Sequence, residues 1–159
     1  MDRDLKDLLS ALNGHGVRYV VVGSYALAVH AQPRATGDLD VLIDRSPENA
    51  RRVYAALAEF GAPLAGLTPK DFEDLDSIFQ MGVSPIRVDI LKRIEALDFE
   101  TVWTASVPWT IDGEVQARYI SEDHFVQNKL AVGRLQDLAD VEAVRQAQAV
   151  KRKPESRRF

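Results

Sequence analysis

Two aspartates, Asp38 and Asp40, stand one residue apart in the apolar run DLDVLI. Because side chains alternate across a strand, both carboxylates project from one face, whereas Leu39, Val41 and Ile43 project from the other. Neighbouring carboxylates repel each other, and an apolar strand gains nothing from them. A hard divalent cation removes that penalty, since Mg²⁺ takes carboxylate oxygens and commonly shares its coordination shell with substrate phosphates. The pair therefore predicts a metal site for phosphate chemistry.

A third carboxylate, Asp89, lies in a second apolar run, RVDIL, where it shares a face with Arg87. If this strand lies beside the first, Asp89 joins the aspartate pair, and three carboxylates ring a two-metal site for phosphoryl chemistry. The alternative is an ion pair between Asp89 and Arg87 or Arg93 at the edge of the sheet.

The rest of the chain predicts the elements that position these side chains. Apolar spacing and capping residues predict helices over residues 3–13, 24–31, 47–60, 121–133 and 136–150, with a short helical turn near Thr68. Strands are predicted over residues 17–22, 39–43, 77–81, 86–91, 106–111 and 114–120. This alternation indicates a mixed α/β (α+β) sheet with flanking helices and a C-terminal helical pair.

Composition limits the classes of function. The chain of 159 residues has no cysteine, so disulfides, zinc–thiolate sites and thiol nucleophiles are excluded. Neither a signal peptide nor an apolar run near the ~20 residues of a membrane span is present, and we expect a cytoplasmic protein without membrane contact.

The charge is distributed unevenly. We expect one domain over residues 1–150, followed by a disordered basic tail, residues 151–159, with five basic residues and one acidic residue. Such a tail can contact nucleic acid. The whole chain has a net charge of −4 although its tail is basic, so residues 1–150 are more acidic than a passive nucleic-acid binder would be.

Together, Gly23-Ser24, Asp38-Leu39-Asp40 and Asp89 resemble the nucleotidyltransferase fold of the DNA polymerase β superfamily. Within it, the run GSYALAVHAQPRATGDLDVLI is most similar to the small bacterial nucleotidyltransferases related to the AbiEii and MenT toxins. A C-terminal segment also resembles the signature of that group, with matching residues Lys129, Arg134, Asp137 and Asp140.

The resemblance implies a role for each matched residue. Asp38, Asp40 and Asp89 would bind Mg²⁺ or Mn²⁺, and Asp89 could also help to activate the acceptor hydroxyl. Gly23 would let the backbone approach phosphate, while the Ser24 hydroxyl and nearby N–H groups would hold the triphosphate.

Further residues of the C-terminal segment and of the loop before Asp38 have less specific roles. Lys129 would neutralise phosphate charge, and either Asp137 or Asp140 would be a further functional carboxylate. The alternative is that Lys129, Arg134 and these aspartates form an interhelical salt-bridge network.

Two loop residues and one histidine complete the candidates. Arg34 and Thr36 could contact nucleotide or acceptor, or lie in a solvated loop. His30 is expected to be a packing or hydrogen-bonding residue rather than a catalytic one.

The implied reaction is metal-dependent transfer of a nucleoside monophosphate from an NTP to an acceptor hydroxyl. The acceptor would be an RNA 3′ end such as that of tRNA, a protein or a small molecule, and the toxin-like resemblance and the basic tail favour RNA. The alternative is a non-catalytic protein of this fold that acts as a toxin–antitoxin or other interaction partner.

Overall fold

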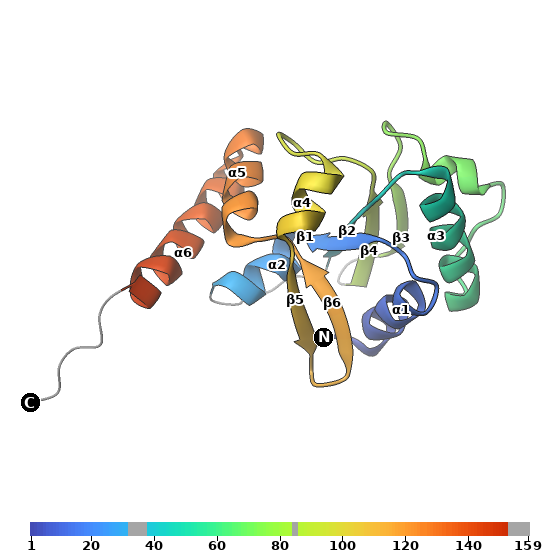
Figure 1. The fold of residues 1–159 in the computed structure, drawn as a ribbon, viewed down its shortest axis with the longest axis horizontal. Coiled ribbons are helices and arrows are strands. Elements are labelled where there is room, and N and C mark those ends of the chain that lie inside the picture. The colour runs from blue at the N-terminus through green and yellow to red at the C-terminus, as the bar shows by residue number, and fades with distance from the viewer. Residues whose placement is uncertain (32–37, 84–85, 153–159) are drawn as a thin grey trace, which may run out of the picture.

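A six-stranded mixed sheet in the order β3-β4-β2-β1-β6-β5 forms the centre of the computed structural model, which describes residues 1–31, 38–83 and 86–152 (Figure 1). The strands are β1 (Tyr19–Val22), β2 (Asp38–Ile43), β3 (Phe79–Val83), β4 (Ile86–Leu91), β5 (Val107–Ile111) and β6 (Val115–Tyr119). The helices are α1 (Arg3–Gly14), α2 (Gly23–His30), α3 (Pro47–Phe60), a 3₁₀ helix (Pro69–Phe72), α4 (Phe99–Ala105), α5 (Glu122–Val132) and α6 (Leu135–Arg152). The predicted mixed fold with a C-terminal helical pair is confirmed.

The helices cover the sheet in two groups. Figure 1 shows α1 and α3 together at one side of the sheet, and α2, α5 and α6 at the other. The apolar residues that alternate with the β2 aspartates, Leu39, Val41 and Ile43, are fully buried. Burial of these side chains is the main favourable term that fixes which face of β2 points outward.

Helix termini follow the capping signals of the sequence. Ser46 accepts a hydrogen bond from the Asn49 N–H, and Pro47 is the first residue of α3. Ser121 caps α5 in the same way, and α5 ends at Gly133, whose φ of 72° is favourable only for a residue without a Cβ. The predicted α3 and α5 are thereby confirmed with their boundaries.

Three local elements differ from the prediction. The first strand begins at Tyr19 rather than Val17. The sequence analysis places no helix between residues 91 and 106, but α4 forms there because Asp98 accepts from the Thr101 N–H. Seven residues are too few for an apolar period to be recognised. The third strand begins at Phe79 rather than Ser77, whose hydroxyl binds outside the ladder, to Asp71 O and Lys92 Nζ.

The position of β2 between β1 and β4 brings the predicted chemistry together. Asp40 is paired with Val22 of the antiparallel β1 and with Asp89 of the parallel β4. Asp38 is paired with Arg87. The expectation that the two aspartate-bearing strands are neighbours is therefore confirmed.

The C-terminal helix extends into the predicted tail. The 18-residue α6 ends at Arg152, and Lys151 forms an ion pair of 2.8 Å with Glu122 of α5. Residues 153–159 lie outside the described part of the chain, so disorder and nucleic-acid contact by the tail stay predictions. No described helix is long and apolar enough to cross a membrane.

Candidate active site

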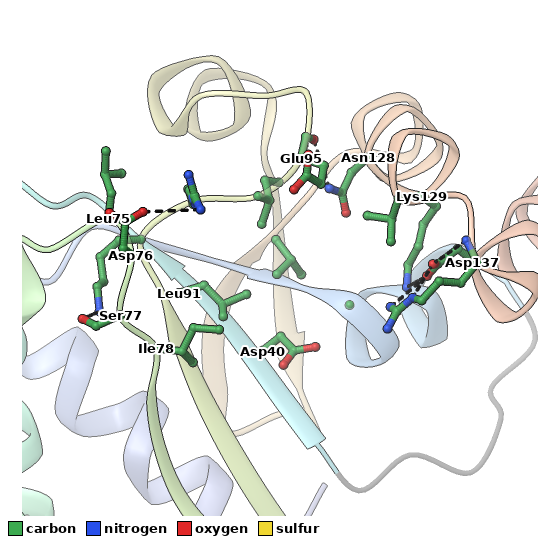
Figure 2. A pocket seen from close by; sticks show the side chains of 17 residues that line it. Asp40, Leu75, Asp76, Ser77, Ile78, Leu91, Glu95, Asn128, Lys129 and Asp137 are labelled. Carbon is green, nitrogen blue, oxygen red and sulfur yellow. Dashed lines mark hydrogen bonds and ion pairs between the residues drawn. The ribbon is translucent and has the colours of Figure 1, made fainter.

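A cleft of about 320 Å³ opens above the middle of the sheet, between the segments that flank β3 and β4 and the helix α5. Figure 2 shows Asp40 at its base, with Ile78 and Leu91 on one side and Lys129 and Asp137 on the other. The predicted residues that line the cleft are Gly23, Asp40, Lys129, Arg134 and Asp137. Segments that are distant in the sequence thus supply both acidic and basic groups to one opening.

Gly23 joins β1 to α2 directly beside Asp40. Its φ is 67°, a left-handed conformation that other residues adopt only at a cost. A Cβ on this residue would also collide with Asp40 Oδ2, so the position requires glycine on two grounds. The N-cap residue of α2 is Val22, whose side chain makes no capping hydrogen bond. Val22 and Gly23 both line the cleft, so α2 begins at the cleft wall. Ser24 belongs to the same turn but is not part of the cleft lining.

The three predicted carboxylates lie on adjacent strands, and a guanidinium lies between two of them. Arg87 Nη2 is 3.1 Å from Asp38 Oδ2 and donates a 3.2 Å hydrogen bond to Asp89 Oδ2. Asp89 thus neighbours Asp40, as the first interpretation requires, and is also paired with Arg87, as the alternative suggests, although β4 is not an edge strand of the described sheet. Metal binding by the three carboxylates stays a prediction. Arg93, the other partner suggested for Asp89, instead pairs with Asp76 at 3.4 Å.

The chemistry of these carboxylates fits a divalent cation, although their present arrangement does not form a metal cage. Within the described residues, no three His, Asp or Glu side chains are grouped closely enough to hold a metal ion. Asp89 Oδ1 is nevertheless buried and accepts no hydrogen bond within the described chain. Burial, then the charges of Asp89 and Asp38, raise the pKa of Asp40 to about 6. A site that repels its own negative charge and has an unsatisfied carboxylate oxygen favours a cation ligand.

The α5–α6 turn holds a buried network of charges. Lys129 Nζ is 3.1 Å from Asp137 Oδ1 and 3.3 Å from Asp140 Oδ2, and all three residues are buried. Arg134 donates to Asp137 from its backbone and side chain. The hydrogen bonds from Arg134, followed by Lys129, hold the pKa of Asp137 at about 2. The predicted interhelical network is therefore present, and its two cations still face the cleft.

Three further candidates from the sequence are two loop residues before Asp38 and one histidine. Arg34 and Thr36 lie outside the described residues, so their roles stay predictions. His30 is buried, and its Nε2 lies 2.6 Å from the Ile120 carbonyl, the packing and hydrogen-bonding role expected for it.

Sequence reasoning missed much of the cleft wall. Asn128 Nδ2 donates a 3.1 Å hydrogen bond to the Glu95 carbonyl and so connects α5 to the segment after β4. The exposed side chains of Leu75 and Ile78 form an apolar rim. The only sequence signal for Asn128 was its position next to Lys129, and nothing marked the rim.

The chain resembles a solved structure of another protein over nearly its whole length. A crystal structure of "a putative nucleotidyltransferase" from Thermotoga maritima matches with a TM-score of 0.60 and 20% sequence identity, over 93% of this chain and 92% of that one. The likeness shows that the chain has the nucleotidyltransferase fold. No protein-family model and no curated protein sequence matches the chain. The closer relation to AbiEii and MenT proteins stays a prediction.

Replacing the cleft glycine should disturb both stability and the site. We expect Gly23→Ala to lower the free energy of unfolding by about 1–3 kcal/mol, because the new Cβ is strained at this φ and displaces the Asp40 carboxylate. Gly14→Ala is the matched control, since nothing lies within 4 Å of a Cβ added there. Urea unfolding measures both changes, and equal effects of the two substitutions would contradict the assignment.

The raised pKa of Asp40 makes stability depend on pH in a definite direction. The folded protein binds this proton more tightly than the unfolded chain, so the contribution is complete below about pH 4 and is lost as the pH rises through 6. In metal-free buffer, Asp40→Asn should therefore gain about 2 kcal/mol relative to wild type between pH 4 and pH 8. Urea unfolding at several pH values tests this, with Asp7→Asn on the exposed side of α1 as control. A constant difference between Asp40→Asn and wild type would refute the electrostatic argument.

Breaking the buried network should be costly. Asp137→Ala leaves Lys129 buried with half of its counter-charge, and we expect it to lower the free energy of unfolding by about 3–5 kcal/mol. Glu142→Ala, at an exposed position of α6, should change it by less than about 0.5 kcal/mol. Thermal or urea unfolding at pH 7 distinguishes these values, and a small effect of Asp137→Ala would show that the network contributes little.

Proposed function

We propose that this protein is a metal-dependent nucleotidyltransferase, which transfers a nucleoside monophosphate from an NTP to an acceptor hydroxyl and releases pyrophosphate. One observation carries the proposal: Asp40, with Asp89 directly opposite on β4, lies at the base of a cleft lined also by Lys129 and Arg134. Such a site has separate zones for cations and for phosphates, as nucleotide transfer requires.

The acidic zone is formed by Asp38, Asp40 and Asp89. These residues would hold Mg²⁺ or Mn²⁺, which would supply charge stabilisation at the transferring phosphate. In the reaction, the acceptor oxygen forms a bond to the α-phosphorus while the bond between the α-phosphorus and the bridging oxygen to the β-phosphate breaks. Asp89 is the candidate base that takes the proton of the acceptor hydroxyl, since it is largely buried and retains an unsatisfied oxygen.

The basic zone is supported by the backbone around α2. Gly23 lets the chain approach a phosphate closely, and the N–H groups that begin α2, with the Ser24 hydroxyl, would favour an anion at this end of the cleft. Lys129 and Arg134 line the cleft while anchored by Asp137. Anchoring holds both cations in place, so they need no reorganisation when the triphosphate binds.

The acceptor is proposed at the level of a hydroxyl: an RNA 3′ end such as that of tRNA, a protein side chain or a small molecule. The resemblance to AbiEii and MenT proteins supports a toxin-like activity on RNA. The name of the Thermotoga maritima neighbour supports nucleotidyl transfer without indicating an acceptor.

A second candidate is a non-catalytic interaction partner of the same fold. The observation that favours it is the exposed apolar surface of the α5–α6 turn, where Leu135 is 88% exposed and Leu130 and Leu138 are each 44% exposed. Exposed apolar groups of this kind occur at protein–protein contacts. None of these three leucines belongs to the cleft lining, so a partner protein bound to them is compatible with catalysis in the cleft.

Binding is tested by thermal unfolding with each Mg²⁺–NTP. A ligand at about 100 times its Kd should add about 2.7 kcal/mol of stability to the wild-type protein. Asp38→Asn/Asp40→Asn should lose this effect, whereas the exposed control Asp7→Asn should keep it. Stabilisation that is unchanged in the double variant would overturn the metal assignment.

Transfer is tested with α-labelled NTPs, Mg²⁺ and either total tRNA or a cell lysate as the acceptor pool. Label should appear on the acceptor with the wild type and fall by more than about 100-fold with Asp38→Asn/Asp40→Asn. Label on RNA or on protein identifies the acceptor class. No labelling and no Mg²⁺–NTP binding would favour the interaction partner instead.

A further inference from the structure

Arg87 occupies an unusual position for a positively charged residue. It shares a strand face with Asp89, two residues along β4, and it is the register partner of Asp38 on β2. Its guanidinium contacts both carboxylates, at 3.1 Å from Asp38 Oδ2 and 3.2 Å from Asp89 Oδ2. Thus Arg87 lies where the proposed function places a divalent cation.

The contact between Arg87 and Asp89 is incomplete. Arg87 Nε is 3.1 Å from Asp89 Oδ1, yet both atoms are buried and neither forms an aligned hydrogen bond within the described residues. A guanidinium usually binds a carboxylate through two parallel hydrogen bonds, and here only one is made. The Arg87 side chain is also 35% exposed, so it has a path into solvent that does not require the core to open.

The ion pairs of Arg87 offset the repulsion between carboxylates in the metal-free protein. Asp38, Asp40 and Asp89 lie on one face of neighbouring strands, and without a cation their charges repel. Among the described residues, Asp40 forms no ion pair, whereas Asp38 and Asp89 are both paired with Arg87. Its charge also lowers the pKa of Asp40, against the effects of burial and of the two neighbouring carboxylates.

We propose, on the basis of the proposed function, that Arg87 is an internal counter-ion that takes the place of the metal in the free protein and leaves Asp38 and Asp89 when a divalent cation binds. The metal then competes with an internal cation for the same carboxylates. Wild-type affinity for metal alone is therefore weaker than three carboxylates would otherwise give, by the free energy of the ion pair.

If Arg87 only held Asp89 in place, its removal would change the affinity for metal in the opposite direction. If Arg87 served only to orient Asp89 for the metal, its removal would let the carboxylate rotate and would weaken metal binding. Competition instead predicts that removal of the guanidinium strengthens metal binding while it destabilises the metal-free protein. The two roles are therefore separated by the direction of one measured change.

The experiment is a titration of the whole purified protein with Mn²⁺ alone, followed by calorimetry or by the electron paramagnetic resonance signal of free Mn²⁺. We expect Arg87→Gln to bind Mn²⁺ about tenfold more tightly than wild type, a typical size for coupling between two competing sites. Arg52→Gln is the matched control, because Arg52 pairs with Glu48 on the exposed side of α3. It should bind Mn²⁺ as wild type does.

Thermal unfolding supplies a second readout that needs no activity. In EDTA, Arg87→Gln should melt below wild type, and the rise in melting temperature on adding saturating Mn²⁺ should be larger for the variant. Arg87→Lys keeps the charge with a shorter reach and should bind Mn²⁺ with an affinity between those of wild type and Arg87→Gln. If Arg87→Gln does not fold, Arg87→Lys carries the test, and it must bind Mn²⁺ more tightly than wild type.

The outcomes separate this proposal from the proposed function. If wild type binds Mn²⁺ and the Arg87 variants bind it with equal or weaker affinity, only the proposed role of Arg87 is overturned. No Mn²⁺ binding by any of these proteins overturns both the metal site and the competition. If Arg87→Gln binds Mn²⁺ more tightly but the wild-type protein transfers no nucleotide, the role of Arg87 is supported and only the catalytic assignment is contradicted.

Discussion

The register of β2 against its two neighbours is the constraint on which the site depends. Leu39, Val41 and Ile43 are fully buried, and this burial fixes Asp38 and Asp40 on the opposite face. A slip of one residue would place both carboxylates in the core and three apolar side chains at the cleft. The same register sets Asp40 beside Val22, where β1 ends, and therefore beside the glycine that begins α2.

Charge is compensated unevenly between the two parts of the site, the sheet and the α5–α6 turn. On the sheet, one arginine lies between two carboxylates, while Asp40 relies on more distant cations. On the α5–α6 turn, the two cations Lys129 and Arg134 face the two carboxylates of Asp137 and Asp140, so positive and negative charges are equal in number. The carboxylates on the turn are well compensated, whereas those on the sheet are not, and this difference is the electrostatic basis of the proposed cation site.

The part of the site that follows from local patterns could be predicted from the sequence. Alternation placed the aspartates on one face, and the capping serines and glycine defined α3 and α5. The short helix α4 could not be predicted, because seven residues give no clear period and its cap is a single aspartate. The cleft wall was also missed, since it depends on how the segments after the 3₁₀ helix and after β4 meet α5 in space. The simultaneous pairing of Arg87 with two strands required the parallel register, which no single segment encodes.

The order of the strands has one further consequence, for the two strands that end the described sheet. Edge strands present unpaired backbone groups and invite association with other chains. In β5 the edge contains Pro108, which has no N–H to donate. In β3 the edge contains Gly82 with a φ of 80°, where a Cβ would collide with the Ile86 carbonyl. A proline and a left-handed glycine thus lie in the two edge strands of the described sheet, where both disfavour the addition of a further strand, so a sheet that holds concentrated charge at its centre also has borders unsuited to edge-to-edge aggregation.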